Sequence, residues 1–328
     1  MSGQQQIMEQ ILSKIKEYKR IILTRHIRPD GDAIGASRGL GEIIRATFPD
    51  KEVYVQTDDK AEYLSFLGSD DDPINPELYK DSLLIVLDTA TEERISNKHY
   101  RLAKEIIKID HHIEKKPYGK IRWVEDWRTS ACEMITYFYQ TYKNELKITP
   151  TANKLLYTGI VVDTDRFRLK STTGNAMRLA AMLLDNGIDT ENLYSNLYLK
   201  DFDHFKFQSY VLGKIKVTPN GVVYLHIDKN MKNELNLTDE QASKAIYFYT
   251  DIKDCIVQLS FISMEDGTIR VMLRSRFMKI NTLAEKFGGG GHEDACGATL
   301  HEESEIQKMI DEADKMLGEY KATHEGYM

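Results

Sequence analysis

Five short apolar runs, rich in β-branched residues, recur along the first 124 residues of the chain. They cover residues 21–23, 53–55, 83–87, 106–109 and 121–124, and helix-compatible stretches such as residues 33–47 separate them. Short buried strands that alternate with helices are typical of a parallel sheet with helices on both faces. The pattern therefore predicts an N-terminal parallel-sheet α/β domain, which an amphipathic helix precedes.

The second half of the chain has a different pattern. Residues 130–200 have helical periodicity, and we expect these helices to cover the sheet. Longer strand candidates follow at residues 214–217, 222–227, 255–263 and 268–274, with Asn-Gly and Asp-Gly turn signals between two of the pairs. We therefore predict an N-terminal domain at residues 1–190, a helical connector at 191–212, and a smaller mixed-sheet α/β domain at 213–328, with a cleft between the two domains.

Composition and charge narrow the class of protein. The 44 Lys and Arg residues against 51 Asp and Glu give a net charge of −7, which argues against a polybasic nucleic-acid binder. No run approaches the ~18 apolar residues of a membrane span, and the first residues lack the apolar region of a secretory signal. Three widely spaced cysteines, Cys132, Cys255 and Cys296, favour reduced thiols. We expect a cytoplasmic protein.

Acidic and histidine residues follow three of the expected strands. The set comprises His26, Asp30 and Asp32 after the first run, Asp88 after the third, Asp110, His111 and His112 after the fourth, and Asp163 and Asp165 at the end of a helical stretch. Ligands of open parallel sheets bind beyond the carboxyl ends of the strands. These side chains are therefore expected to converge at one edge of the sheet.

Each residue also has an ordinary structural interpretation when it is taken alone. An aspartate such as Asp32 or Asp88 often caps the next helix, and a single histidine is commonly structural. Several carboxylates and imidazoles in one place would, however, be costly to hold together without cations. Asp and His ligands without cysteine favour the harder cations Mn²⁺ and Mg²⁺ over a structural zinc.

Four segments resemble, in order, the four motifs of the DHH phosphoesterases. They are HIRPDGDAIGAS at residues 26–37, LDTAT at 87–91, IDHH at 109–112 and GIVVDTDRF at 159–167. The resemblance implies a site for two divalent cations, usually Mn²⁺, with Mg²⁺ or Co²⁺ as alternatives. The cation ligands that it implies are His26, Asp30 and Asp88 for one ion, and Asp32, the shared Asp88, His111 and Asp163 for the other.

The resemblance also implies roles around the reacting phosphate. The reaction would be hydrolysis by a hydroxide that bridges the two cations, with Asp88 and His112 as catalytic residues. His112 would contact the scissile phosphate or assist the leaving group, and Asp110 would orient the histidines as a hydrogen-bond acceptor. Asp165 stands where related enzymes often carry a small or uncharged residue, so its role is left open.

A run of four glycines lies near the C-terminus, within FGGGGHEDACGA at residues 287–298. A flexible linker is one interpretation of the run, and a loop whose backbone N–H groups cradle a phosphate is the other. We expect a helix before the run and a small-residue turn after it. The spelling resembles the glycine-histidine motif of the DHH-associated C-terminal domain, and Arg274-Ser275 resembles the Arg-Ser that accompanies it. The implied substrate-binding residues are Arg274, Ser275, Gly289, Gly290, Gly291 and His292, whereas Arg276 is interpreted as a solvated strand end.

Together the two resemblances cover nearly the whole chain and narrow the family to its short nanoRNase and phosphoadenosine-phosphate phosphatase type. They imply hydrolysis of short oligoribonucleotides, including linear dinucleotides such as pApA and pGpG, and of 3′-phosphoadenosine 5′-phosphate to AMP. A related phosphatase or pyrophosphatase for another small molecule, and a non-catalytic nucleotide-binding protein, are the alternatives. We expect no long duplex nucleic acid and no membrane as partners, and a homodimer is left open.

Overall fold

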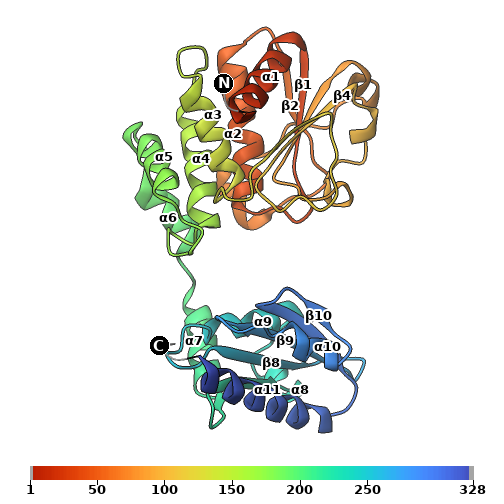
Figure 1. Cartoon of the computed structure of the whole chain (residues 1–328), viewed down its shortest axis with the longest axis vertical. Helices are drawn as coiled ribbons and strands as arrows, with labels where there is room; N and C mark the ends of the chain where they lie inside the picture. The colour runs from red at the N-terminus through yellow and green to blue at the C-terminus, as the bar shows by residue number, and fades with distance from the viewer. Residues whose placement is uncertain (1–2, 325–328) are drawn as a thin grey trace. The chain divides into compact units, whose positions relative to one another are not determined.

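The computed structural model describes residues 3–324, and the chain divides into two compact units, Met1–Leu199 and Lys200–Met328 (Figure 1). The predicted connector at residues 191–212 holds two helices. The first, α6 (Thr190–Tyr198), belongs to the N-terminal unit, and the second, α7 (Phe202–Leu212), belongs to the C-terminal unit.

The N-terminal unit is built on a five-stranded sheet. Its strands are β1 (Arg20–Thr24), β2 (Glu52–Val55), β3 (Leu83–Leu87), β4 (Glu105–Asp110) and β5 (Ile121–Val124). The order is β2-β1-β3-β4-β5 and every neighbouring pair is parallel, which confirms the predicted fold class. The chain runs outward from β1 to β2 and then returns to place β3 on the other side of β1. Such a reversal opens a crevice at the carboxyl ends of β1 and β3.

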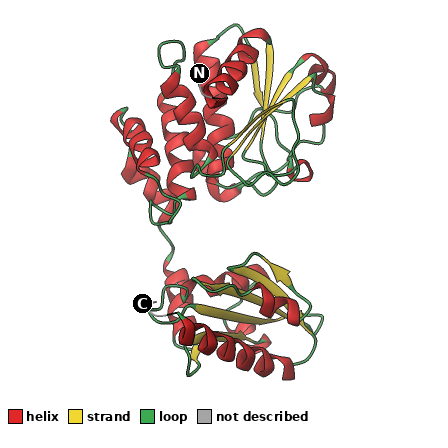
Figure 2. Cartoon of the chain, viewed as in Figure 1, coloured by secondary structure: helices red, strands yellow, loops and turns green. Residues whose placement is uncertain are grey.

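Helices cover the two faces of this sheet differently (Figure 2). The face that carries Ile21 and Leu23 packs on α1 (Gly3–Glu17) and α2 (Gly31–Thr47). The opposite face carries Ile22 and packs on short 3₁₀ helices. The 3₁₀ helices of this unit are η1 (Glu62–Leu67), η2 (Pro76–Asp81), η3 (Glu92–Arg94) and η4 (Tyr100–Leu102).

Helices α3 (Ala131–Thr141), α4 (Pro150–Asp163) and α5 (Gly174–Asp185) form a further layer. We expected them to cover the sheet, but α4 packs mainly on α2, which itself lies on the sheet. Glycines permit this close approach. A Cβ at Gly35 of α2 would lie 2.5 Å from the Leu155 carbonyl oxygen of α4, and one at Gly159 would lie 2.8 Å from Asp32 Oδ1. The beginning of α2 and the end of α4 are thereby brought together.

The C-terminal unit contains a six-stranded mixed sheet, as predicted. Its order is β10-β11-β9-β8-β7-β6, in which only β7 and β8 are parallel neighbours. The strands are β6 (Lys216–Val217), β7 (Val222–Ile227), β8 (Val257–Ser263), β9 (Ile269–Ser275), β10 (Gly290–Gly291) and β11 (Ala295–Leu300). One face packs on α7, α8 (Lys229–Glu234), α9 (Asp239–Lys244) and η5 (Ala245–Phe248), and the other on α10 (Asn281–Lys286) and α11 (Ser304–Thr323).

Two details of the C-terminal sheet differ from expectation. The small-residue turn expected after the glycine run is replaced by β11, all six residues of which pair with β9. The glycine run is predicted to be a linker or a loop, but its residues Gly290 and Gly291 form a strand that pairs with β11, so it is not a linker. Among residues 3–324, no helix is both long and apolar enough to span a membrane.

Candidate active site

The six predicted cation ligands lie together at the carboxyl ends of β1, β3 and β4. The N-terminus of α2 and the C-terminus of α4 lie at the same place. Their donor atoms form two groups, and within each group the atoms lie within 4.8 Å of one another. The groups are His26, Asp30 and Asp88, and Asp32, His111 and Asp163. Asp88 joins them, because its Oδ2 lies 3.3 Å from His26 Nε2 and its Oδ1 lies 3.3 Å from His111 Nε2.

Backbone groups orient the first of these groups. His26 Nδ1 donates a hydrogen bond of 2.8 Å to the Ile27 carbonyl, which directs Nε2 towards Asp88. Asp30 caps α2, since its Oδ1 accepts from the backbone N–H groups of Asp32 and Ala33, each at 3.0 Å. Its Oδ2 lies 3.9 Å from His26 Nε2. The capping role considered for Asp32 therefore belongs to Asp30, which retains one oxygen for a cation.

The second group is held by two helix ends. Both oxygens of the buried Asp32 accept backbone hydrogen bonds from the first turn of α3, at 2.6 Å from Ala131 N and 2.8 Å from Cys132 N. His111 Nε2 lies 3.8 Å from Asp32 Oδ2 and 3.2 Å from Asp163 Oδ2. Asp163 is the last residue of α4, and a carboxylate at a helix C-terminus is unfavourable unless a cation compensates it.

Asp88 is strained as well as buried. Its φ is 50°, a left-handed conformation that is uncommon for residues other than glycine, and its exposed fraction is 2 %. Its Oδ1 has no well-directed hydrogen bond among the described residues. A buried carboxylate oxygen without a hydrogen bond is costly, whereas a position between two cations would satisfy it. The donor set and this unsatisfied oxygen therefore fit a site for two hard divalent cations.

Without cations, protons balance the charge of the cluster. Burial raises the pKa of Asp163 to about 9 and that of Asp32 to about 7, and the neighbouring carboxylates add to both shifts. Burial alone would lower the pKa of His111, but the carboxylates of Asp88, Asp32 and Asp163 raise it to about 10. Burial would raise the pKa of Asp88, but the neighbouring His111 and His26 imidazoles hold it well below its usual range. The metal-free cluster therefore holds protons on its carboxylates and imidazoles. Cations that bind there would have to displace these protons.

His112 lies beside this cluster at the surface. Its Nδ1 lies 2.8 Å from Asp110 Oδ1 and 3.5 Å from Asp88 Oδ1, and 45 % of its side chain is exposed. A ring that donates from Nδ1 to Asp110 presents Nε2 for proton exchange. Asp165, whose role was left open, lies on an exposed turn, where it pairs with Arg168 at 3.3 Å and Arg166 at 3.5 Å.

The predicted substrate-binding residues of the C-terminal unit are also brought together. Arg274 pairs in register with Ala295 of β11, and Gly291 of β10 pairs with Cys296, the next residue of the same strand. The Arg274 guanidinium donates to Tyr247 Oη at 3.1 Å, and His292 is exposed. Ser275 Oγ donates to the Met278 carbonyl. Arg276 forms an ion pair with Asp251 at 2.9 Å.

The glycine run is an edge strand that continues from a helix end. The N–H of Gly289 donates to the Ala284 carbonyl at 2.8 Å, so this donor is used inside the fold. Gly290 and Gly291 form β10, which lies at the edge of the sheet. A cavity of about 440 Å³ adjoins His292 and is lined by Phe277, Met278, Lys279, His292, Glu293 and Asp294.

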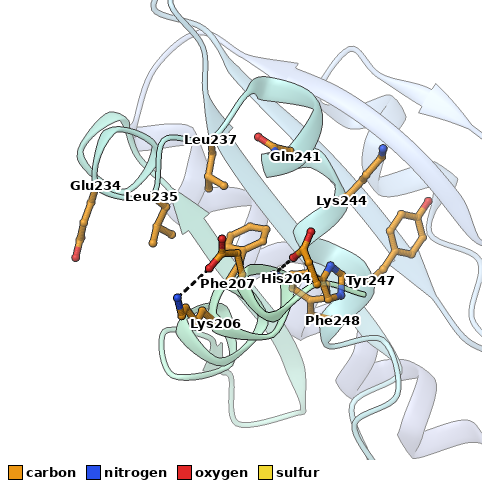
Figure 3. Close-up of a pocket in the computed structure, with 12 residues that line it drawn as sticks. His204, Lys206, Phe207, Glu234, Leu235, Leu237, Gln241, Lys244, Tyr247 and Phe248 are labelled. Carbon is orange, nitrogen blue, oxygen red and sulfur yellow. Dashed lines mark hydrogen bonds and ion pairs between the residues drawn. The ribbon is translucent and has the colours of Figure 1, made fainter. Parts of the chain in front are cut away.

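A larger cavity of about 720 Å³ lies between α7, α9, the end of η5 and the loop after α8 (Figure 3). Its apolar wall includes Phe207 and Phe248, whose rings meet edge to face with centroids 5.3 Å apart. The charged lining consists of Asp201, Asp203 and Glu234 against Lys206 and Lys244. This balance does not favour a phosphate-rich ligand, so we assign the cavity no part in the candidate site.

Comparison with known proteins identifies the family. Residues 20–160 match the DHH family, N-terminal domain, and residues 221–319 match the DHHA1 domain. A Bacillus subtilis protein named bifunctional oligoribonuclease and PAP phosphatase NrnA is 34% identical over 95% of this chain and 99% of its own length. The chain belongs to the DHH family. The predicted resemblance to this family is thereby confirmed.

A second curated relative and a solved structure are also similar to this DHH protein over nearly its whole length. A Streptococcus mutans protein, named as a probable bifunctional oligoribonuclease and PAP phosphatase NrnA, is 36% identical over 94% of this chain and 98% of its own. The solved structure of an exopolyphosphatase-related protein from Bacteroides fragilis covers 97% of both chains with a TM-score of 0.82. At 22% identity, that likeness shows a shared fold.

Sequence reasoning missed one charged group at the DHH site. Lys108 lies in the middle of β4, is completely buried, and its Nζ lies 3.2 Å from Asp110 Oδ2. The available signal was a single charged residue inside the otherwise apolar run at residues 106–109.

Proposed function

We propose that this protein hydrolyses short oligoribonucleotides, including linear dinucleotides such as pApA and pGpG, to mononucleotides, and 3′-phosphoadenosine 5′-phosphate to AMP. Membership of the DHH family makes it a hydrolase of phosphoester bonds. The observation that carries the finer proposal is the pair of donor groups with Asp88 between His26 and His111, in a chain that matches proteins named NrnA over nearly their whole length.

The proposed cofactor is a pair of divalent cations, Mn²⁺ in the first place. His26, Asp30 and Asp88 would hold one, and Asp32, Asp88, His111 and Asp163 would hold the other. When bound, such ions polarise a phosphate and lower the pKa of water towards neutrality. The chain contributes a buried setting, in which electrostatic interactions are stronger than in water, and backbone donors that fix Asp30 and Asp32.

His112 would move the proton. Its Nδ1 is engaged by Asp110, so Nε2 is the atom that can donate to the leaving oxygen as the P–O bond breaks. In the C-terminal unit, Arg274 would bind a substrate phosphate through its guanidinium. Ser275, Gly289, Gly290, Gly291 and His292 are the other proposed contacts.

The test uses the full chain with Mn²⁺ and labelled di- to pentaribonucleotides, with 3′-phosphoadenosine 5′-phosphate in parallel. Mononucleotides and AMP should accumulate, and chelation of the metal should stop both reactions. Inorganic pyrophosphate and inorganic polyphosphate serve as comparison substrates, because the alternative is a related enzyme for another small phosphorylated molecule. Intact oligonucleotides alongside cleaved pyrophosphate would favour that alternative, and nucleotide binding without any turnover would favour a non-catalytic binding protein.

A further inference from the structure

Lys108 is a lysine that lies wholly inside the N-terminal unit, on the strand that leads to the two histidines. Its exposed fraction is 0 %. Residues two apart on a strand share a face, so Lys108 lies on the same face as Ile106, which packs with the apolar cluster under the 3₁₀ helices. An ammonium group in such a place is costly unless charges and acceptors surround it. The groups that contact the Lys108 ammonium therefore indicate how its burial is compensated.

Four groups surround the ammonium. Lys108 Nζ donates to the Ala90 carbonyl at 3.1 Å and lies 3.2 Å from Asp110 Oδ2. It also lies 3.6 Å from Glu114 Oε1 and 4.7 Å from the centre of the Tyr118 ring. Asp110 Oδ2 is buried and has no hydrogen-bond partner among the described residues, so the Lys108 ammonium offsets its charge.

These contacts join two segments that carry site residues. Asp110 uses its other oxygen, Oδ1, to hold His112 Nδ1 at 2.8 Å. Ala90 lies two residues after the strained Asp88, and the Tyr118 hydroxyl donates to the intervening Thr89 carbonyl at 2.6 Å. A single buried cation therefore contacts both the carboxylate behind His112 and the backbone that follows Asp88.

We propose that Lys108 is a positioning residue of the reaction, which fixes Asp110 so that His112 presents Nε2 to the substrate. Lys108 touches neither substrate nor metal in this proposal and acts through Asp110. The inference rests on the proposed role of His112. It explains why a charged residue occupies the otherwise apolar run at residues 106–109 of β4, because an apolar side chain there would leave the Asp110 carboxylate buried without a compensating charge.

A double-mutant cycle in kcat tests the proposal. Lys108→Met keeps the length of the side chain and removes the charge, and it should lower kcat by about 10- to 100-fold, the usual effect of losing an outer partner. In a His112→Ala background the same change should lower kcat by less than about threefold, because the group that Lys108 positions is gone. If the two changes multiply in the double variant, or if Lys108→Met retains normal kcat, the proposal is wrong.

A second readout does not depend on turnover. The ¹⁵N shifts of His112 in the Mg²⁺-loaded full chain should report an Nδ1-protonated ring in the natural protein and a mixture of tautomers in Lys108→Met. An unchanged ring state would overturn the proposal even if the RNA-cleaving function proved wrong. Lys232→Met is the matched control, since Lys232 is 6 % exposed and pairs with Asp239 at 2.6 Å in the other unit. Should Lys108→Met not fold, Lys108→Gln enters the same cycle and the same spectrum.

Discussion

The two units present their site residues in opposite ways. In the N-terminal unit two central carboxylates are buried, with Asp32 at 0 % and Asp88 at 2 % exposure, and backbone donors of α3 fix Asp32. In the C-terminal unit Arg274 is half-buried, His292 is exposed, and the neighbouring chain is glycine. Burial strengthens electrostatic interactions, whereas exposed groups exchange contacts with water readily.

The difference separates two tasks. A buried, pre-oriented cluster of carboxylates and imidazoles suits tight binding of cations and stabilisation of charge in the transition state. Exposed donors beside a glycine strand suit reversible contact with a substrate, which must leave after each turnover. Changes in the first unit should therefore act mainly on kcat, and changes in the second mainly on KM.

The largest effect is expected at Asp88, which lies between the two donor groups and contacts His26 of one and His111 of the other. Asp88→Asn keeps the shape of the side chain but removes the charge, and kcat should fall by about 10³-fold or more, or about 4 kcal/mol of transition-state stabilisation. The measurement is single-turnover hydrolysis of pApA with Mn²⁺. Asp165→Asn makes the same change on the exposed turn and should leave kcat within about twofold. A rate for Asp88→Asn within tenfold of the natural protein would refute the shared position.

The corresponding change in the C-terminal unit is Arg274→Ala. Loss of the guanidinium should raise KM for short oligonucleotides by about 10- to 100-fold and change kcat less, because a charge-assisted contact to phosphate is lost from both the bound and the transition state. Initial rates over a range of substrate concentration measure both constants. Arg276→Ala is the control, since that side chain pairs with Asp251. A fall in kcat at constant KM would remove the distinction between the two units.

The sequence predicted the N-terminal sheet well because the physical signal is local. Each strand is a short run of β-branched or apolar residues, and β3 and β5 begin and end at the predicted residues. The ligands were predictable because they immediately follow such runs. The backbone donors that hold Asp32 were not, since Ala131 and Cys132 are about a hundred residues away along the chain and carry no polar side chain for the purpose.

Non-local pairing also explains the errors. Half of residues 295–300 are glycine or alanine, which have weak strand propensity, and pairing with β9 determines the conformation of the segment. Ser130 and Glu133 have the residue types and spacing of a capping box, but only half of it forms. Ser130 Oγ accepts from the Glu133 N–H at 2.9 Å, whereas the Glu133 carboxylate accepts from Arg128 and Thr129. The Glu133 side chain therefore bonds to buried residues outside the helix in place of the backbone N–H that a capping box requires.

A smaller effect, on stability, is expected in the glycine run. It tests whether the run is packed in the fold, independently of any contact with a ligand. A Cβ at Gly289 would lie 2.2 Å from the Gly297 carbonyl oxygen, whereas one at Gly290 would meet nothing within 4 Å. Gly289→Ala should therefore lower the free energy of unfolding by about 1–3 kcal/mol, and Gly290→Ala should change it by less than about 1 kcal/mol. Denaturant unfolding of the full chain, followed by a probe in the C-terminal unit, measures both. Equal stability of the two variants would mean that β10 does not lie against β11 in solution.

The smallest expected effect is the pH dependence of stabilisation by metal. Raised pKa values of about 7 for Asp32, 9 for Asp163 and 10 for His111 mean that the metal-free folded state binds more protons than the unfolded chain from about pH 4 to pH 10. Its stability therefore falls as pH rises through this window. The lowered pKa of Asp88 acts in the opposite sense, but only below the ordinary range for aspartate, outside the window.

Cations that displace these protons should bind more tightly at high pH. The increase in Tm on adding Mg²⁺ should therefore be larger at pH 8.5 than at pH 6, by a few degrees for about 1 kcal/mol of extra stabilisation. Differential scanning fluorimetry of the full chain gives the increments. In Asp88→Asn the increment should be small at both pH values, because the carboxylate between the two donor groups has lost its charge. If the increase in Tm on adding Mg²⁺ became smaller as pH rises, the buried cluster would not exchange protons for cations. The proposed contrast with the exposed C-terminal site would then be wrong.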